Sequence, residues 1–179
     1  MAEGFKTGYG LDLSAGRIVL ARCARHGVPQ ALLAASADSE EAVRALKSVA
    51  ADVDNGAAAL ALCAPAAQTV VRRLRAPFAS PRKAAKVWAS LLDVDLPFPV
   101  ESAACFYGAP RLDNGSTVAV AAAIRKSDLA ALGEACRAAG FEPTHCDAEA
   151  LALWNQQVAE APPARDGLPR ALVWLGADH

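Results

Sequence analysis

The sequence predicts an α/β protein with a mixed β-sheet flanked by helices. Hydrophobic residues make up 54% of the 179 residues, which is enough to bury a core. Three short apolar segments separated by turn residues open the chain, as in an antiparallel meander. Helical and strand-like patterns then alternate to the end of the chain, which is typical of the α/β class.

The first half of the chain begins with three predicted strands, at residues 6–14, 17–24 and 30–35. The next helix, at 39–53, has Asp38 as its expected N-cap and Glu41 completing a capping box. Its buried stripe is expected to be Val43, Leu46, Val49 and Val53. A buried strand at 57–63 follows. A meander, a helix and a strand in this order fit a ribonuclease H-like core, among other folds.

A second group of elements follows Pro65. We expect a strand at 68–75 and a helix that begins with Ser80 and Pro81 and is stopped by Pro97-Phe98-Pro99. Strands at 102–110 and 117–126 are joined through Asp113-Asn114-Gly115, a strong hairpin signal.

The last elements are two helices and two short strands. Ser127 is expected to cap one helix, and a strand at 143–146 follows it. Asp147 is expected to cap the other helix, which would bury Leu151, Trp154 and Val158. A Pro-rich linker then leads to a final apolar strand at 170–175.

The hairpin at residues 9–22 carries the most informative motif. An apolar run ends in Asp12, passes a turn of small residues and resumes. Small residues let a phosphate approach backbone N–H groups, and an Asp in such a turn can hold a hydrated metal ion. The candidate phosphate loop is therefore Asp12, Ser14, Ala15 and Gly16. An ordinary hairpin with a solvated Asp is the alternative.

Composition excludes several classes of function. A net charge of −1 argues against a general nucleic-acid binder. The first nine residues lack an apolar signal region, and the apolar run at 57–67 is too short to span a bilayer, so we expect a cytoplasmic protein. The five cysteines form no C-x-x-C pair and are expected to be reduced thiols. Neighbours in His145-Cys146-Asp147 point to alternate faces of a strand, so no metal site is predicted.

A basic stretch lies between residues 72 and 86. It carries six positive charges and no acidic residue: Arg72, Arg73, Arg75, Arg82, Lys83 and Lys86. Such a stretch can bind anionic lipid headgroups or an acidic partner. It can equally be a solvated strand edge and helix face.

Four segments together resemble the PilM family of type IV pilus assembly proteins and the related cytoplasmic actin-like domain of type II secretion protein L. They are Gly10–Ser14 with Arg17–Val19, Val70–Pro77, Leu96–Glu101, and Ala122–Lys126 with Ala138–Pro143 and Asp147–Leu153. The resemblance implies an actin-like, ribonuclease H-like core from residues 1–65 and 147–179. It also implies an inserted α+β subdomain at 66–146.

The resemblance further implies that the chain holds only the first half of the actin-like fold. The strand at 172–177 would open the second half, so the chain would be a fragment or a reduced homologue. Ser14 stands where the family usually has Gly, and Trp174 stands where an Asp is expected. Both departures imply a degenerate phosphate site, with no cofactor bound and no catalysis.

The resemblance therefore implies a non-catalytic adaptor, cytoplasmic and peripheral to the inner membrane, in a pilus or secretion complex. It would bind the cytoplasmic tail of a membrane protein in a groove between subdomains, and it would bind no nucleic acid. The expected partner-binding residues are Arg72, Arg73, Pro97, Phe98 and Pro99. A homodimer would form if the strand at 170–175 were exchanged between copies.

Two enzymatic alternatives stay open. In an ATP-dependent member of the actin-like or sugar-kinase superfamily, Asp12 would position metal-bound water and Ser14–Gly16 would contact the phosphates. A ribonuclease H-like nuclease would need several clustered carboxylates, and only Asp147 or Asp178 could join Asp12.

Overall fold

The computed structural model describes residues 7–13, 16–24, 27–36, 39–54, 58–138, 140, 142–161 and 171–173. The chain divides into two compact units. Unit 1 comprises Met1–Cys63 and Ala139–His179, and unit 2 comprises Ala64–Ala138. The subdomain expected at 66–146 from the sequence remains a prediction. The two units instead group residues 139–146 with the two ends of the chain, in unit 1.

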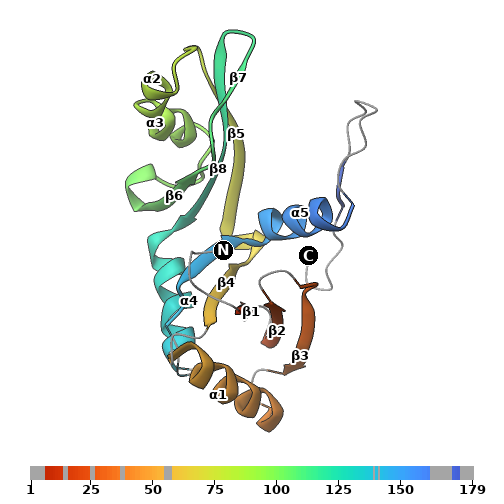
Figure 1. Ribbon diagram of the computed structural model, residues 1–179. Helices are drawn as coiled ribbons and strands as arrows, with labels where there is room; N and C mark the ends of the chain where they lie inside the picture. Colours follow the sequence, from red (N-terminus) through yellow and green to blue (C-terminus); the bar gives the residue numbers. More distant parts are fainter. Residues whose placement is uncertain are drawn as a thin grey trace. The chain divides into compact units, whose positions relative to one another are not determined.

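Unit 1 is built on a five-stranded mixed sheet, which confirms the predicted α/β class (Figure 1). Its strands, in the order β3-β2-β1-β4-β9, are Gln30–Ser36, Arg17–Ala24, Thr7–Asp12, Ala58–Ala64 and His145–Ala148. The first three strands form an antiparallel meander. Strand β4 then pairs in parallel with β1 after a helical crossover, as parallel pairs require.

The core of unit 1 lies between one face of this sheet and helix α1 (Glu40–Asp54). The fully buried side chains of the sheet are leucines that alternate along the strands: Leu11, Leu20, Leu60 and Leu62. Helix α1 contributes Ala42, Leu46 and Val49. The Tyr9 hydroxyl donates to Asp52 Oδ2 at 2.5 Å and fastens the helix to β1. Burial and this hydrogen bond both raise the pKa of Tyr9.

The other face of the unit 1 sheet is more open. Glycine and alanine occupy most of its positions on β1 and β4, and Val19 on β2 is 38% exposed. Alternation of buried and exposed side chains is expected when a single layer of helix covers a sheet.

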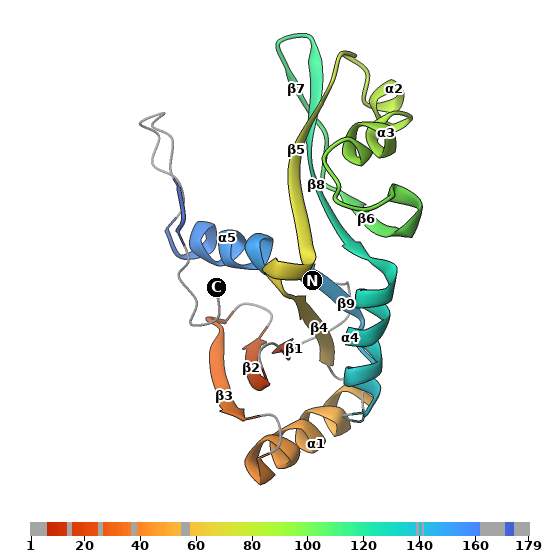
Figure 2. The same ribbon diagram turned by 180° about the vertical axis from the view of Figure 1, so that it is seen from behind.

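Unit 2 contains an antiparallel sheet with helices on one face (Figure 2). The strands are β5 (Thr69–Ala76), β8 (Ser116–Arg125) and β6 (Ala103–Tyr107) in that order, and β7 (Arg111–Asp113) also pairs with β8. Asn114 and Gly115 have φ of 47° and 75°, so the predicted hairpin between β7 and β8 is confirmed. Two short 3₁₀ turns, Ala66–Gln68 and Val100–Ser102, precede β5 and β6.

The core of unit 2 lies between this sheet and helices α2 (Pro81–Ala85) and α3 (Trp88–Asp93). The sequence predicts one helix here, and this prediction was wrong because the chain leaves the helix at Lys86 and Val87. The separation allows Trp88 and Leu92 to pack beside Ala84 over the small residues of β8. Helix α4 (Lys126–Ala138) ends unit 2.

The starts of three helices differ from the predicted N-caps. At the start of α1 the Ser39 Oγ accepts a hydrogen bond from the Ala42 N–H at 3.1 Å, so Ser39 is the N-cap residue. The predicted N-cap, Asp38, lies outside the described residues. Ser127 is inside α4, where its Oγ donates to Asp128 Oδ1. Asp147 belongs to β9, and helix α5 (Glu149–Glu160) begins two residues later. The last two predicted caps were therefore wrong.

Some predicted burial was also wrong. Val43 and Trp154 are exposed, because Ala42 and not Val43 faces the sheet and because α5 has no fully buried residue. In the predicted strand at 170–175, Ala171–Val173 are not in a strand, and the rest lies outside the described residues. Within the described part of the chain, no helix is long and apolar enough to cross a membrane.

Candidate functional site

The candidate site of unit 1 lies at the carboxyl ends of its parallel strands. Asp12 is the last residue of β1. The parallel register pairs Leu11 with Leu62, so one further residue brings Asp12 beside Cys63 of β4. Both side chains are on the open face of the sheet, opposite to the buried leucines. In α/β sheets, ligands bind at this end of the strands.

The pKa of Cys63 shows which groups gather around this point. Burial raises it most, and the charges of Asp12, Glu149, Cys146 and Asp147 raise it further, to about 12. Burial and Asp147 also raise the pKa of Cys146. Strand β9 and the first turn of α5 therefore deliver two carboxylates to the neighbourhood of Cys63. At neutral pH both thiols are protonated, and the negative charge of the site belongs to its carboxylates.

Several carboxylates at the ends of strands attract cations, but these carboxylates do not surround a common point. Among the described residues, no three His, Cys, Asp or Glu side chains are arranged to hold a metal ion. Asp147 Oδ1 accepts from the Ala148 N–H at 2.9 Å, and His145 Nδ1 lies 2.9 Å from Thr144 Oγ1. The Thr144 hydroxyl and N–H both donate to the Leu60 carbonyl at 2.9 Å, which fixes the entry of β9 beside β4.

The predicted phosphate loop is described in part. Asp12 is half-buried at the end of β1, and Gly16 has φ of 69°, which a residue with a side chain adopts only under strain. Ser14 and Ala15 lie outside the described residues, as does Trp174, which stands at the position of the expected second carboxylate. The positive φ of the turn therefore accounts for a glycine at position 16, without any need for a bound phosphate.

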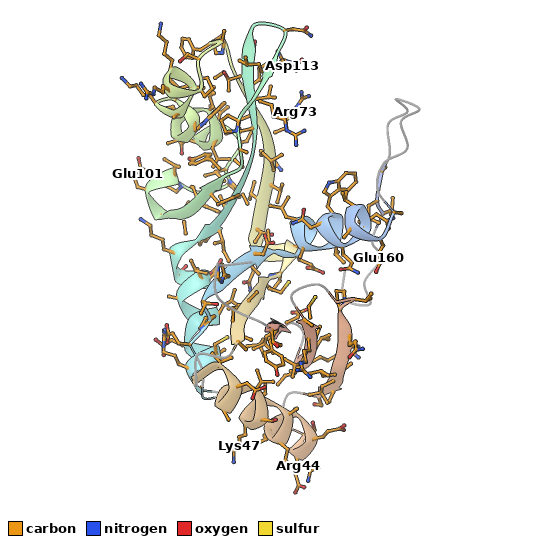
Figure 3. The ribbon with its side chains drawn as sticks, viewed as in Figure 1. Arg44, Lys47, Arg73, Glu101, Asp113 and Glu160 are labelled. Carbon is orange, nitrogen blue, oxygen red and sulfur yellow. The ribbon has the colours of Figure 1, made fainter. Side chains whose placement is uncertain are left out.

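The predicted partner-binding arginines point to opposite faces of β5. Arg73 lies opposite Val120 on the face away from α2 and α3, where its Nη2 donates to Asp113 Oδ2 at 3.0 Å (Figure 3). Arg72 lies opposite Ala121 on the helix-covered face, and its Nη1 donates to the Val71 carbonyl at 2.9 Å. Successive residues of a strand cannot share a face.

The segment Pro97-Phe98-Pro99 lies on the helix-covered side of the sheet. Phe98 packs against the core of unit 2, and the Arg125 guanidinium lies 4.8 Å from its ring centroid, as in a cation–π contact. The two prolines are exposed. The structure therefore brings Arg72 and Phe98 to one side of the sheet and leaves Arg73 on the other.

The six basic residues do not form one patch. Arg73 and Arg75 share the carboxylate of Asp113, an acid that lies outside the basic stretch in sequence. Arg82, Lys83 and Lys86 are exposed at α2, and no ion pair of theirs is found in the described part of the chain. Only strand pairing could reveal the Asp113 contact, because about forty residues of sequence separate it from Arg73.

Sequence reasoning also missed that Cys63 lies beside Asp12 and that Glu149 lies near Cys63. A usable signal was present, because the carboxyl ends of parallel strands meet at the same edge of a sheet. Cys63 lies near the end of a predicted buried strand, and Glu149 follows the short strand before the last helix.

Known structures share this fold. One is the cytoplasmic domain of EpsL, an inner-membrane component of the type II secretion system of Vibrio cholerae (TM-score 0.56, 16% identity, 78% of this chain and 56% of that chain). Another is the PilM-PilN type IV pilus biogenesis complex (TM-score 0.55, 16% identity, 87% of this chain and 52% of that chain). These likenesses confirm the expected actin-like α/β fold.

Other comparisons add little. A protein from Bacteroides thetaiotaomicron with an actin-like ATPase fold and unknown function matches at a TM-score of 0.44 and 15% identity, over 87% of this chain and 57% of that chain, and we draw nothing from it. No family model and no curated protein matches the sequence. The chain spans about half the length of the structures it resembles.

Proposed function

We propose that this chain is an actin-like scaffold of a type IV pilus or type II secretion assembly complex, located in the cytoplasm at the inner membrane. The observation that carries the proposal is the shared fold of its two units with the EpsL cytoplasmic domain and with PilM-PilN. The sequence supports the proposal independently, because the four segments that resemble the PilM family extend along nearly the whole chain.

The proposed scaffold binds the cytoplasmic tail of an inner-membrane protein. One similar structure is a complex of PilM with PilN, so a PilN-type tail from the same organism is the first partner to test. With the tail displayed on a sensor, we expect saturable binding of this chain, and a scrambled tail serves as the control. Absence of binding to both a PilN-type tail and a secretion-type tail would contradict the proposal.

The proposed scaffold is not catalytic. Ser14 and Trp174 replace the glycine and the carboxylate that the family resemblance leads us to expect at two phosphate loops. Without that glycine and that carboxylate the site offers a nucleotide fewer polar partners, so ATP should bind weakly or not at all. Titration calorimetry with magnesium-ATP checks this, and a dissociation constant in the low micromolar range would contradict it.

The alternative function is an ATP-binding, ATPase-type member of the same fold. The place of Asp12 at the carboxyl end of β1 favours it, because there its carboxylate could position the water of a hydrated magnesium ion near a nucleotide. If this alternative is correct, Asp12→Asn should abolish magnesium-dependent ATP binding. The conservative Arg82→Lys variant on α2 serves as the control.

A further inference from the structure

The face of the unit 2 sheet away from α2 and α3 is unusually apolar. Strand β8 alternates its side chains between the two faces, and Ala119, Ala121 and Ala123 point toward the helices. An antiparallel strand with one solvated face normally carries polar residues on that face. Beyond Ser116, the residues of β8 on this face are instead apolar: Val120 is exposed, Ala122 is half-buried, and Val118 and Ile124 are buried.

Two large apolar side chains on this face are exposed to solvent. Phe106 of β6 is 63% exposed and lies opposite Ala122, and Val120 is 43% exposed one step along the same face. A pair of neighbouring exposed apolar residues on a rigid sheet is typical of a contact surface.

Guanidinium groups border these apolar side chains. Arg73 and Arg75 both donate to Asp113 Oδ2, and Arg75 Nη1 also donates to the Asp113 carbonyl at 3.3 Å. Arg111 shares the face because it lies opposite Val118. Three arginines and one aspartate give the paired strands a charge of +2 on this face.

The shared carboxylate also holds the arginines in place. Each guanidinium has five N–H donors, so an arginine that donates one or two of them to Asp113 keeps others for a ligand. The side chains of Arg73 and Arg75 are 67% and 48% exposed, which leaves these donors accessible. Such arginines bind carboxylates with less loss of conformational entropy than free side chains do.

We propose that this outer face docks an acidic segment of a partner protein. The face is defined by Arg73, Arg75, Phe106, Arg111, Asp113 and Val120. Carboxylates of the segment would bind the three guanidiniums, and aromatic or aliphatic side chains between them would cover Phe106 and Val120. The inference rests on the proposed scaffold function, because it assigns to this scaffold a surface and the chemistry of one partner.

A protein segment fits this face better than an anionic membrane. Membrane adsorption depends on an excess of exposed positive charge, and here one aspartate neutralises part of it at the centre of the cluster. The exposed cations Arg82 and Lys83 belong to α2, and Lys86 follows it directly; α2 packs on the other face of the sheet. The outer face combines directed guanidiniums with an aromatic residue, the composition of a protein interface.

Selection from a random peptide library tests the chemistry directly. We expect peptides that combine Asp or Glu with aromatic or aliphatic residues. A synthetic copy of the selected peptide should bind at least about tenfold more weakly to the double variant Arg73→Gln, Arg75→Gln and to Phe106→Ala. Added salt should also weaken the binding. The matched control, Arg82→Gln with Lys83→Gln, removes two charges from α2 and should bind like the parent chain.

Three outcomes would overturn the inference. The first is selection of basic or purely apolar peptides. The second is equal binding by the double variant and the parent, with circular dichroism showing both folded. The third is flotation with phosphatidylglycerol vesicles that the double variant loses and the α2 control keeps, which would assign the face to a membrane.

Failure of the scaffold function is distinguishable from failure of this inference. If neither the PilN-type nor the secretion-type tail binds, the function fails whatever the peptide selection shows. If a tail binds and the selected peptides ignore the outer face, only the docking surface is wrong.

Discussion

The two sheets of this chain present polar groups in different ways. The mixed sheet of unit 1 gathers them at its strand ends, where Asp12, Cys63 and Asp147 come from three different strands. The antiparallel sheet of unit 2 gathers them on one face, where Arg73 and Asp113 meet across β8. Parallel pairing aligns carboxyl ends, whereas antiparallel pairing places residues distant in sequence side by side.

The two sites also differ in charge. Burial raises the pKa of the Cys63 thiol most, and nearby carboxylates raise it further; these carboxylates make the site favour cations. Guanidiniums outnumber carboxylates on the outer face of unit 2, so that face favours anions. A chain with a net charge of only −1 therefore holds two local fields of opposite sign.

The largest expected effect tests whether the unit 1 sheet has one covered and one open face. Leu60 is fully buried under α1, so Leu60→Ala should lower the free energy of unfolding by about 2–5 kcal/mol. The matched change Val19→Ala removes two methyl groups from the open face and should cost less than about 1 kcal/mol. Denaturant titration measures both. Similar losses would show that Val19 is covered in solution.

A smaller effect tests the raised pKa of Cys63, which burial and the surrounding carboxylates both cause. The thiol has an ordinary pKa of 9.0 in the unfolded chain and about 12 in the folded chain. Between these values the unfolded chain binds fewer protons, so stability present below pH 9 is lost as pH rises. Because solvent screens this half-buried thiol, the slope should be less than about 1.4 kcal/mol per pH unit.

The variant Cys63→Ala should reduce this loss of stability between pH 9 and 11, and denaturant titrations at several pH values measure it. Cys23→Ala is the matched control, because Cys23 lies at the other end of the β1–β2 pair from Asp12. Identical pH slopes for the parent and Cys63→Ala would show that neither burial nor the nearby carboxylates raise the pKa of Cys63.

The class of the fold could be predicted from local patterns, because strand alternation and turn residues are short-range signals. The meander, the α1 crossover and the Asn114-Gly115 hairpin all depend on neighbours in sequence. The break between α2 and α3 was missed because it depends on how Trp88 packs against a sheet formed by distant strands. A helical pattern by itself does not show where tertiary packing interrupts a helix.

The sites were predicted less completely. Asp12 was identified from its hairpin, but Glu149 and Cys63 required knowledge of which strands are neighbours. The separation of Arg72 from Arg73 could have been predicted, because side chains alternate along a strand. The contact of Arg73 with Asp113 could not, since it depends on the register of two strand pairs.

The smallest expected effect compares two serines near the starts of helices, Ser39 before α1 in unit 1 and Ser127 in α4 of unit 2. Ser39 accepts from the Ala42 N–H at the start of α1, so Ser39→Ala should cost about 1 kcal/mol of stability. Ser127 lies inside α4 and its hydroxyl donates an exposed hydrogen bond to the neighbouring Asp128 side chain, so Ser127→Ala should change stability by less than about 0.5 kcal/mol. The same denaturant titrations separate the two, because both changes remove one hydroxyl group. If Ser127→Ala proved the costlier change, Ser127 would be the N-cap that the sequence predicts, and α4 would begin after it and not at Lys126.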